Sequence, residues 1–357
     1  MKRFLAALLS ILMIFALCAC GQTEPPQETN SGSDPQGEQQ EQGDYTVATS
    51  TDKYNLKFSS SAADGTAWTT GCQKFAELVE QRTNGNVKIT VYPSDQLSGG
   101  NQSKGLEQVM SGIDDMDAHS NVTYTVYDES YGVISLPFLY SKVEDADAII
   151  AEGGPGYEIY RKMLEKDNLV LLGIAENGMR QLTTNTPVYK PADLKGLKIR
   201  IPGINMYLSI FGALGANAQT MNFSELFTAL QQKTVDGQEN PVDLIDTNKF
   251  YEVQDYITMW NYSYDVIFFV VNKDLYDSMP ADYQKILKEC GQEACAYEIE
   301  LNRSRTDEQL ANFKANGMEV IYPDEQAVAE FRTMCEPVFD TYGEIFGDEI
   351  VNAFKVS

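Results

Sequence analysis

Histidine is almost absent from this 357-residue sequence, which contains one, His119, together with six cysteines. A lone imidazole has no second histidine with which to share a metal ion, and the cysteines after Cys20 form no C-x-x-C pair. We therefore expect no metal site and no cofactor. The four later cysteines are expected as free core thiols, with a disulfide as the open alternative: Cys72, Cys290, Cys295 and Cys335.

Positive charge is also scarce. Lysine and arginine number 27 against 52 aspartates and glutamates, which gives a formal net charge of −25. Nucleic-acid binding requires a basic stripe, so we expect no nucleic-acid partner. An anionic small molecule would have to be bound by individual arginines, against the repulsion of the whole molecule.

Recognised catalytic and nucleotide-binding motifs are missing too. The sequence contains no P-loop, G-x-S-x-G, H-E-x-x-H or dinucleotide-binding fingerprint. An exported carbohydrate-active enzyme would need two carboxylates facing one cleft, and only Glu176, Glu239 and Asp265 are candidates for that pair. We therefore do not expect an enzyme, and such an enzyme is the less favoured alternative.

The N-terminus carries an apolar run, Phe4–Leu17, directly after the basic residues Lys2 and Arg3. This run is short for a membrane span and has the length of the central part of a signal peptide. The protein is therefore expected to be exported, to the periplasm or the extracellular face of the cell membrane.

The residues at the end of this run, Leu17-Cys18-Ala19-Cys20, resemble a bacterial lipobox. They predict a lipoprotein signal peptide over residues 1–19 and lipidation of Cys20, which would anchor the chain to the membrane. An ordinary secretory signal is the alternative. Residues 20–50 are rich in Gln, Glu, Pro, Ser and Gly, so they are predicted to be a disordered tether.

Folded structure is predicted to begin with a β-α-β-α-β series. Strands are expected at residues 54–58, 86–93 and 116–121, with helices over 66–83 and after Asn101. Such a series forms a parallel sheet with right-handed crossovers, so an α/β fold is expected.

A second part of the sheet is expected after residue 177. The buried strand 169–174 passes into a polar strand through Asn177-Gly178, where we place a crossing between domains. Asn222 and Glu225 form a capping-box pattern that predicts a helix over 224–232. Further helices are expected at 146–166, 205–214, 241–250, 280–316 and 325–342, and further strands at 256–260, 266–272 and 318–322.

Arg200 is the most informative candidate for ligand binding. It lies in a short apolar strand that stops at Pro202, and therefore at the carboxyl edge of the sheet, where open α/β sheets bind ligands. Its guanidinium is a planar fork of donors that matches a carboxylate or a phosphate. From this stretch alone, a surface charge with an acidic neighbour is the alternative.

Other candidates lie at comparable positions. His119, Ser120 and Asn121 end the third strand, and Arg180 lies near the predicted domain crossing. The aromatic residues Trp260 and Tyr264 precede an apolar strand beside the same crossing. For the strand-end residues and the aromatic rings, pocket lining and purely structural packing are both open.

Several segments resemble one family in the same order and spacing. They are residues 178–183, 194–202, 214–217, 223–231, 235–241 and 249–254. On these segments the chain is similar to the solute-binding subunit of tripartite ATP-independent periplasmic (TRAP) transporters, of the DctP type. The resemblance covers the chain from about Tyr54 onwards.

The resemblance implies a two-lobed, periplasmic-binding-protein-like α/β fold with a ligand cleft between the lobes. Each lobe would hold a mixed, mostly parallel sheet flanked by helices. We expect lobe I to comprise residues 51–177 plus 266–305 and lobe II residues 178–265 plus 306–357. The implied function is to capture an organic acid and deliver it to the TRAP membrane permease subunits, and we expect a monomer.

The resemblance also assigns roles to residues. Arg200 matches the arginine that grips the substrate carboxylate, and Arg180 matches a second pocket arginine. Phe223 and Asn240 match residues that pack against and hydrogen-bond the carboxylate end. Contacts from the first lobe, which vary with the substrate, are expected from Ser61, Asn101, Ser120 and Asn121.

Departures from relatives bear on the substrate. Gly203 and Ser120 replace residues typical of sialic-acid binders, and Asn261 stands where C4-dicarboxylate binders often carry histidine. The residues Trp260, Tyr264, Asp265, His119 and Asn121 favour ring stacking and several polar contacts. A sugar acid such as a uronate is therefore the expected substrate, with a C4-dicarboxylate, a keto acid or an aromatic acid as the alternative.

Overall fold

The computed structural model describes residues 45–356. The predicted signal peptide over 1–19, the lipidation residue Cys20 and the tether as far as Asp44 lie outside the described residues. No helix between Tyr45 and Val356 is long and apolar enough to cross a membrane.

The elements follow the predicted α/β order. The strands are β1 (Tyr54–Ser60), β2 (Val87–Tyr92), β3 (Met116–Ser120), β4 (Leu169–Thr184), β5 (Lys198–Ile201), β6 (Asn217–Thr220), β7 (Gly237–Pro241), β8 (Tyr256–Thr258), β9 (Tyr264–Asn272) and β10 (Glu319–Ile321). The helices are α1 (Ala67–Arg82), α2 (Gln102–Met110), α3 (Asn121–Tyr124), α4 (Asp147–Ile150), α5 (Pro155–Lys166), α6 (Asn205–Ala213), α7 (Leu226–Gln231), α8 (Val242–Thr247), α9 (Lys273–Ser278), α10 (Ala281–Ala315), α11 (Glu325–Phe346) and α12 (Asp348–Phe354).

The strands form a mixed sheet in the order β2-β1-β3-β9-β4-β7-β5-β6, with β8 beside β4 and β10 beside β8. The pairs β1/β2 and β1/β3 are parallel, as the β-α-β-α-β series predicted, and so are β5/β6 and β5/β7. The strand β9 pairs antiparallel with both β3 and β4. The α/β fold class is confirmed, while the boundaries of the two lobes stay a prediction.

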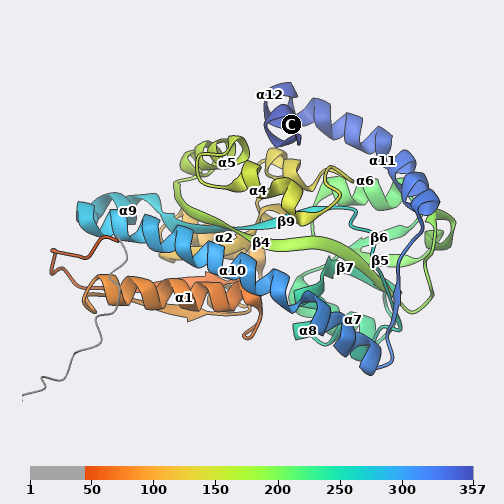
Figure 1. Ribbon diagram of the computed structural model, residues 1–357, viewed down its shortest axis with the longest axis horizontal. Coiled ribbons are helices and arrows are strands. Elements are labelled where there is room, and N and C mark those ends of the chain that lie inside the picture. The colour runs from red at the N-terminus through yellow and green to blue at the C-terminus, as the bar shows by residue number, and fades with distance from the viewer. Residues whose placement is uncertain (1–44, 357) are drawn as a thin grey trace, which may run out of the picture. The chain divides into compact units, whose positions relative to one another are not determined.

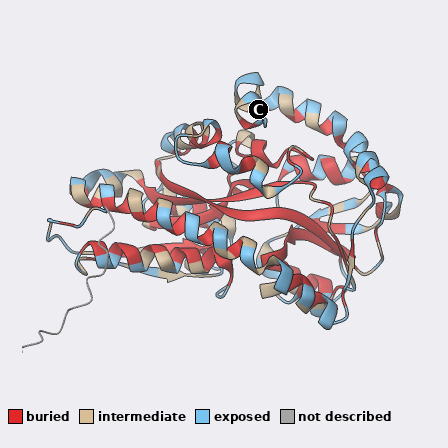
Figure 2. Ribbon diagram, in the orientation of Figure 1, coloured by how far each residue is buried: buried red, intermediate tan, exposed pale blue. Residues whose placement is uncertain are grey.

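The strand β4 joins the two groups of strands without leaving the sheet (Figure 1). It pairs with β9 over much of its length and with β7 and β8 towards its end. The register with β9 shifts between Glu176 and Gly178, at the crossing predicted from the sequence. Gly178 has φ +107°, a conformation that a residue with a Cβ rarely adopts. Figure 2 shows that β4 is buried along its course.

The long helix α10 packs on α1, β4 and α8 (Figure 1). Two glycines allow its close approach to β4. A Cβ on Gly291 would lie 2.7 Å from Cβ of Leu172, and one on Gly173 would lie 2.7 Å from Sγ of Cys295. Neither contact leaves room for a methyl group, so these glycines set the distance between helix and strand.

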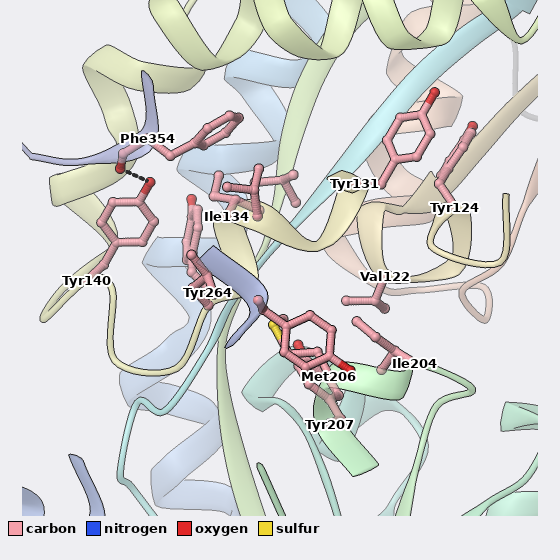
Figure 3. Close-up of a cluster of buried hydrophobic side chains, with 14 of the residues drawn as sticks. Val122, Tyr124, Tyr131, Ile134, Tyr140, Ile204, Met206, Tyr207, Tyr264 and Phe354 are labelled. Carbon is pink, nitrogen blue, oxygen red and sulfur yellow. Dashed lines mark hydrogen bonds between the residues drawn. The ribbon is translucent and has the colours of Figure 1, made fainter. Parts of the chain in front are cut away.

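Aromatic side chains fill much of the core on one side of the sheet. Phe268 of β9 contacts the rings of Tyr124, Tyr131 and Tyr160 at centroid distances of 4.7–6.0 Å. The Tyr140 hydroxyl donates a 2.7 Å hydrogen bond to the carbonyl of Phe354, which ties α12 to this cluster (Figure 3).

The segment 45–50 is hydrogen-bonded to α10, although the sequence placed it in the disordered tether. Thr46 donates from its backbone amide and hydroxyl to the Glu289 carboxylate at 2.9 and 2.8 Å. Ser50 donates from its hydroxyl to Asp282 at 2.6 Å. These hydrogen bonds explain the difference, because composition does not reveal the acceptors that α10 supplies.

One local prediction was wrong, and two short elements had not been predicted. Asn222 makes no capping hydrogen bond through its side chain, because residues 223–225 form a 3-10 turn before α7 begins at Leu226. The short strand β6 and the terminal helix α12 were not anticipated. The expectation of free core thiols is confirmed for the four cysteines of the described part, Cys72, Cys290, Cys295 and Cys335.

Candidate ligand-binding site

A pocket lies where β1, β3, β5 and β7 end against β4. It encloses about 400 Å³ of space between atoms, part of it open to solvent. The lining residues predicted from the sequence are Ser61, Ser120, Arg180, Arg200, Phe223, Asn240 and Asp265. The others are Ala62, Trp68, Gln102, Val122, Thr123, Asn177, Pro202 and Leu244. The pocket thus lies at strand ends, where the sequence predicted ligand binding.

Arg200 is buried at the end of β5, with 1% of its surface exposed. Its Nε and Nη2 donate to the carbonyl oxygen of Met221 at 3.1 and 2.8 Å, and its guanidinium lies 5.7 Å from the centre of the Phe223 ring. No carboxylate among the described residues forms an ion pair with it. Burial lowers the pKa of Arg200 to about 10, although Glu239 opposes this shift. The side chain therefore remains a cation at neutral pH without a direct counter-ion.

Arg180 has the opposite environment. Its Nε and Nη1 donate to Glu239 and Asp265, and its Nη2 donates to Oε1 of Glu239 at 2.9 Å and to Oδ1 of Asn240 at 3.2 Å. Burial alone would lower the pKa of Arg180, but Glu239 and the other neighbouring acids hold it well above its ordinary value. Two buried carboxylates therefore compensate this single charge.

Asp265 connects Arg180 to the pocket wall. Its Oδ1 accepts from the Ser120 hydroxyl at 2.5 Å, and its Oδ2 accepts from Asn177 Nδ2 at 2.9 Å and from Arg180. Burial raises the pKa of this carboxyl, with Arg180 acting in the other direction.

The opposite wall is polar but carries no charge. The Ser61 hydroxyl donates to Oδ2 of Asp95 at 2.8 Å and accepts from Gln102 Nε2 at 2.6 Å. Trp68 lines the pocket, and its buried Nε1–H has no acceptor among the described residues. An orphaned buried donor in a pocket wall is unfavourable unless a ligand oxygen or water accepts from it.

His119 lies behind this wall rather than in it. Its Nδ1 is 2.5 Å from Oδ2 of Asp117, and its Nε2 is 2.8 Å from Oδ1 of Asp95. Burial lowers the pKa of an imidazole, but the two carboxylates outweigh burial and raise the pKa of His119 to about 10. The imidazolium is thus next to Asp95, which in turn accepts from Ser61.

Four further predicted residues do not line the pocket. Asn101 caps α2 by accepting from the Lys104 amide at 3.0 Å, and Asn121 donates to the carbonyl of Tyr131 at 3.0 Å. Trp260 packs 4.7 Å from the Tyr262 ring. Tyr264 donates to Oε2 of Glu176 at 2.8 Å and lies beside Tyr140, as Figure 3 shows.

Strand alternation explains several of these differences. Successive residues of a strand point to opposite faces, so Asp265 of β9 reaches the pocket while Tyr264 points away. The same rule separates Ser120 from His119 on β3. Trp68 and Gln102 line the pocket but were not predicted from the sequence. Trp68 is spaced with Cys72 and Phe75 as core residues of a helix are, which gives no sign of a pocket.

The residues from 45 to 356 contain no group of three histidine, cysteine or acidic side chains placed to hold a metal ion. Three carboxylates were candidates for a catalytic pair and are called the seam acids here: Glu176, Glu239 and Asp265. Each of them is paired with an arginine. Glu239 and Asp265 are bound to Arg180, and Glu176 accepts from Arg303 at 2.6 Å. The pocket therefore offers hydrogen-bonding groups and one cation without a counter-ion.

The chain is similar to proteins of one known family. Residues 58–345 match the model of the DctP family, described as bacterial extracellular solute-binding protein, family 7. The chain is 32% identical over 250 residues to the 2,3-diketo-L-gulonate-binding periplasmic protein of Escherichia coli, covering 70% of this chain and 75% of that relative. It is 32% identical over 307 residues to the C4-dicarboxylate-binding periplasmic protein of Rhodobacter capsulatus, covering 85% and 90%.

Among solved structures, the fold is similar to that of the sugar acid binding protein of Advenella mimigardefordensis in complex with galactonate. The TM-score is 0.81 at 28% sequence identity, and the match covers 85% of this chain and 97% of that structure.

Proposed function

We propose a function from one premise: the chain belongs to bacterial extracellular solute-binding protein family 7. The protein captures an organic acid outside the cytoplasm and delivers it to the membrane permease subunits of a TRAP transporter. Its best-supported substrate is a sugar acid, and the galactonate complex of a relative supports this choice.

The main support for the proposal is that Arg200 is a buried cation without a direct counter-ion among the described residues. A buried cation without a counter-ion is unfavourable by itself, whereas a carboxylate that accepts two parallel N–H bonds compensates its charge. Phe223 packs against the guanidinium, and Asn240 of β7 lines the same pocket and accepts from Arg180 Nη2 at 3.2 Å. We therefore assign the ligand carboxylate to Arg200.

The remaining walls favour a hydroxylated ligand. Ser61, Gln102, Ser120 and Asp265 supply donors and acceptors around the space that the rest of the ligand would occupy. A keto acid or an aromatic acid would leave more of these polar groups unsatisfied. Catalysis is not proposed, because the three seam acids are held in ion pairs with arginines.

We further propose that Cys20 carries a lipid anchor, that the protein is a monomer, and that the two predicted lobes close over the ligand. The lipobox-like sequence supports the anchor. The passage of β4 through both groups of strands supports a hinge near Gly178.

A calorimetric screen of the purified protein tests the proposed function. The panel contains uronates, aldonates, C4-dicarboxylates, keto acids and aromatic acids, together with the uncharged sugars and alditols of the same carbon skeletons. We expect binding by at least one acid and by none of the uncharged counterparts. Binding of an uncharged sugar in place of every acid would contradict the assignment of Arg200 to a carboxylate.

A further inference from the structure

The lining of the pocket carries two positive charges and one negative charge. Arg180 and Arg200 are its only cations and Asp265 its only acid, counted over the residues that the structure describes. Glu239 adds a second buried carboxylate, bound to Arg180. Both acids are paired with Arg180, so Arg200 is the one lining cation without a direct counter-ion. One ligand carboxylate can pair with Arg200, and a second carboxylate would add a negative charge with no free cation among the described lining residues.

Only one of the two arginines is available to a ligand. Arg180 already binds both Glu239 and Asp265, and its Nη2 also donates to Asn240. A carboxylate that approached Arg180 would have to displace one of these acids and leave it buried without its cation, which is strongly unfavourable. Arg200 has no such competitor among the described carboxylates.

Away from Arg200, the pocket lacks a place for a second anion. Ser61, Gln102 and Trp68 carry no charge, and Asp265 would repel a carboxylate. Asp265 instead needs a donor. An ionised carboxylate offers about four lone-pair sites, and those of Asp265 accept from Ser120, Asn177 and Arg180, which leaves about one free. A ligand hydroxyl can donate to that site, whereas a carboxylate can only accept.

From this charge balance we infer that the substrate is a hydroxylated monocarboxylate, and that Asp265 excludes dicarboxylates from the pocket. The single carboxylate binds Arg200, and a hydroxyl group donates to Asp265. The orphaned Trp68 Nε1–H supplies a donor to another ligand oxygen. This inference rests on the proposed function, because it specifies the organic acid that the same pocket takes.

Matched pairs of acids test the inference on the unaltered protein. Each pair has the same carbon skeleton and differs in whether one terminus is a hydroxymethyl or a carboxylate group: galactonate and galactarate, gluconate and glucarate, 4-hydroxybutyrate and succinate. In every pair that binds, we expect the monoacid to bind at least about tenfold more tightly. The reason is that Asp265 and the second carboxylate of a diacid would repel each other at close range.

The possible results separate the two proposals. A diacid that binds as tightly as its monoacid, or more tightly, overturns the inference and leaves organic-acid binding standing. Heat from none of the acids contradicts the proposed function and the inference together.

The variant Asp265→Asn identifies the residue responsible. Asparagine keeps the shape and removes the charge, and Arg180 keeps Glu239 as its partner. We expect the preference for the monoacid to shrink about tenfold or more. Asp243→Asn is the matched control, since Asp243 is also buried and hydrogen-bonded, to Ala67 and Gln309, but does not line the pocket. An unchanged preference in Asp265→Asn would remove Asp265 from the assignment.

Discussion

The two arginines of the pocket differ in their counter-ions, and this difference separates binding from stability. Arg180 is compensated by Glu239 and Asp265, so its charge contributes to the packing of β4 against β7 and β9. Arg200 has a backbone carbonyl and an aromatic ring as neighbours. Substitutions at the two positions should therefore have different consequences.

Replacing Arg200 by alanine should abolish most ligand binding and leave the fold intact. Loss of one side of a buried charge pair costs about 2–5 kcal/mol, which is roughly a hundredfold or more in affinity. Calorimetry with the best acid of the screen measures this, and thermal unfolding checks the fold. Arg161→Ala, on the partly exposed surface of α5, is the control and should bind as the unaltered protein does. Micromolar binding retained by Arg200→Ala would contradict the assignment.

Replacing Arg180 by alanine should instead destabilise the protein. The change leaves Glu239 and Asp265 buried without their cation, and breaking such a pair costs about 3–5 kcal/mol. Chemical denaturation measures the free energy of unfolding. An Arg180→Ala protein as stable as Arg200→Ala would show that the two carboxylates do not depend on Arg180.

His119 should make stability depend on pH. Its folded pKa of about 10 lies above the ordinary value of 6.5, so its stabilising contribution is complete below pH 6.5 and is lost as the pH rises through about 10. The unaltered protein should therefore lose its advantage over His119→Gln across this range, by up to about 1.4 kcal/mol per pH unit. Urea denaturation between pH 6 and 10 tests this, and a constant difference would mean that His119 is not charged in the folded state.

At the scale of elements, the approach of α10 to β4 is set by glycine. Gly291→Ala would place a methyl group 2.7 Å from Leu172 Cβ, so the free energy of unfolding should fall by about 1–3 kcal/mol. Gly343 of α11 is a helical glycine whose added Cβ would have no atom within 4 Å beyond its chain neighbours and its own helix backbone, and Gly343→Ala should be neutral or slightly stabilising. Equal effects of the two substitutions would contradict this account of the helix–strand contact.

The order of the elements could be predicted from the sequence because hydrophobic periodicity and glycine positions are local. Position at the end of a strand likewise singled out Arg200 and Ser120, both of which line the pocket. The faces of individual residues could not be predicted, because they depend on register. The shift between Glu176 and Gly178 sets how β9 lies on β4, and therefore that Asp265 rather than Tyr264 meets the pocket.

Trp260 illustrates the same limit. Its place in the sequence beside the domain crossing favoured ring stacking on a ligand. In the structure it packs on its near neighbour Tyr262 and on Phe138, Phe211 and Phe331, which come from three separate segments. Packing partners so distant along the chain leave no local signal.

At the scale of the whole molecule, the net charge of −25 opposes the arrival of an anion. Screening this repulsion should speed up association, whereas the buried contact with Arg200 is screened much less. We expect the association rate constant to rise as the salt concentration increases from about 10 to 100 mM, over which the Debye length falls from roughly 30 to 10 Å. Stopped-flow tryptophan fluorescence measures the rate, since Trp68 lines the pocket. Sucrose of equal osmolarity is the control, and a rate that falls with salt would indicate local electrostatic attraction at the pocket mouth.

The four cysteines of the described residues are free thiols, although the chain belongs to a family of extracellular proteins. Folding needs no oxidant, because Cys72, Cys290, Cys295 and Cys335 are buried without a disulfide. Burial also raises the pKa of both Cys290 and Cys335 to about 12, so little reactive thiolate exists in the native protein. Only an unfolded molecule exposes all four groups to oxidation. Oxidation of the thiols should therefore damage unfolded molecules irreversibly and spare native ones.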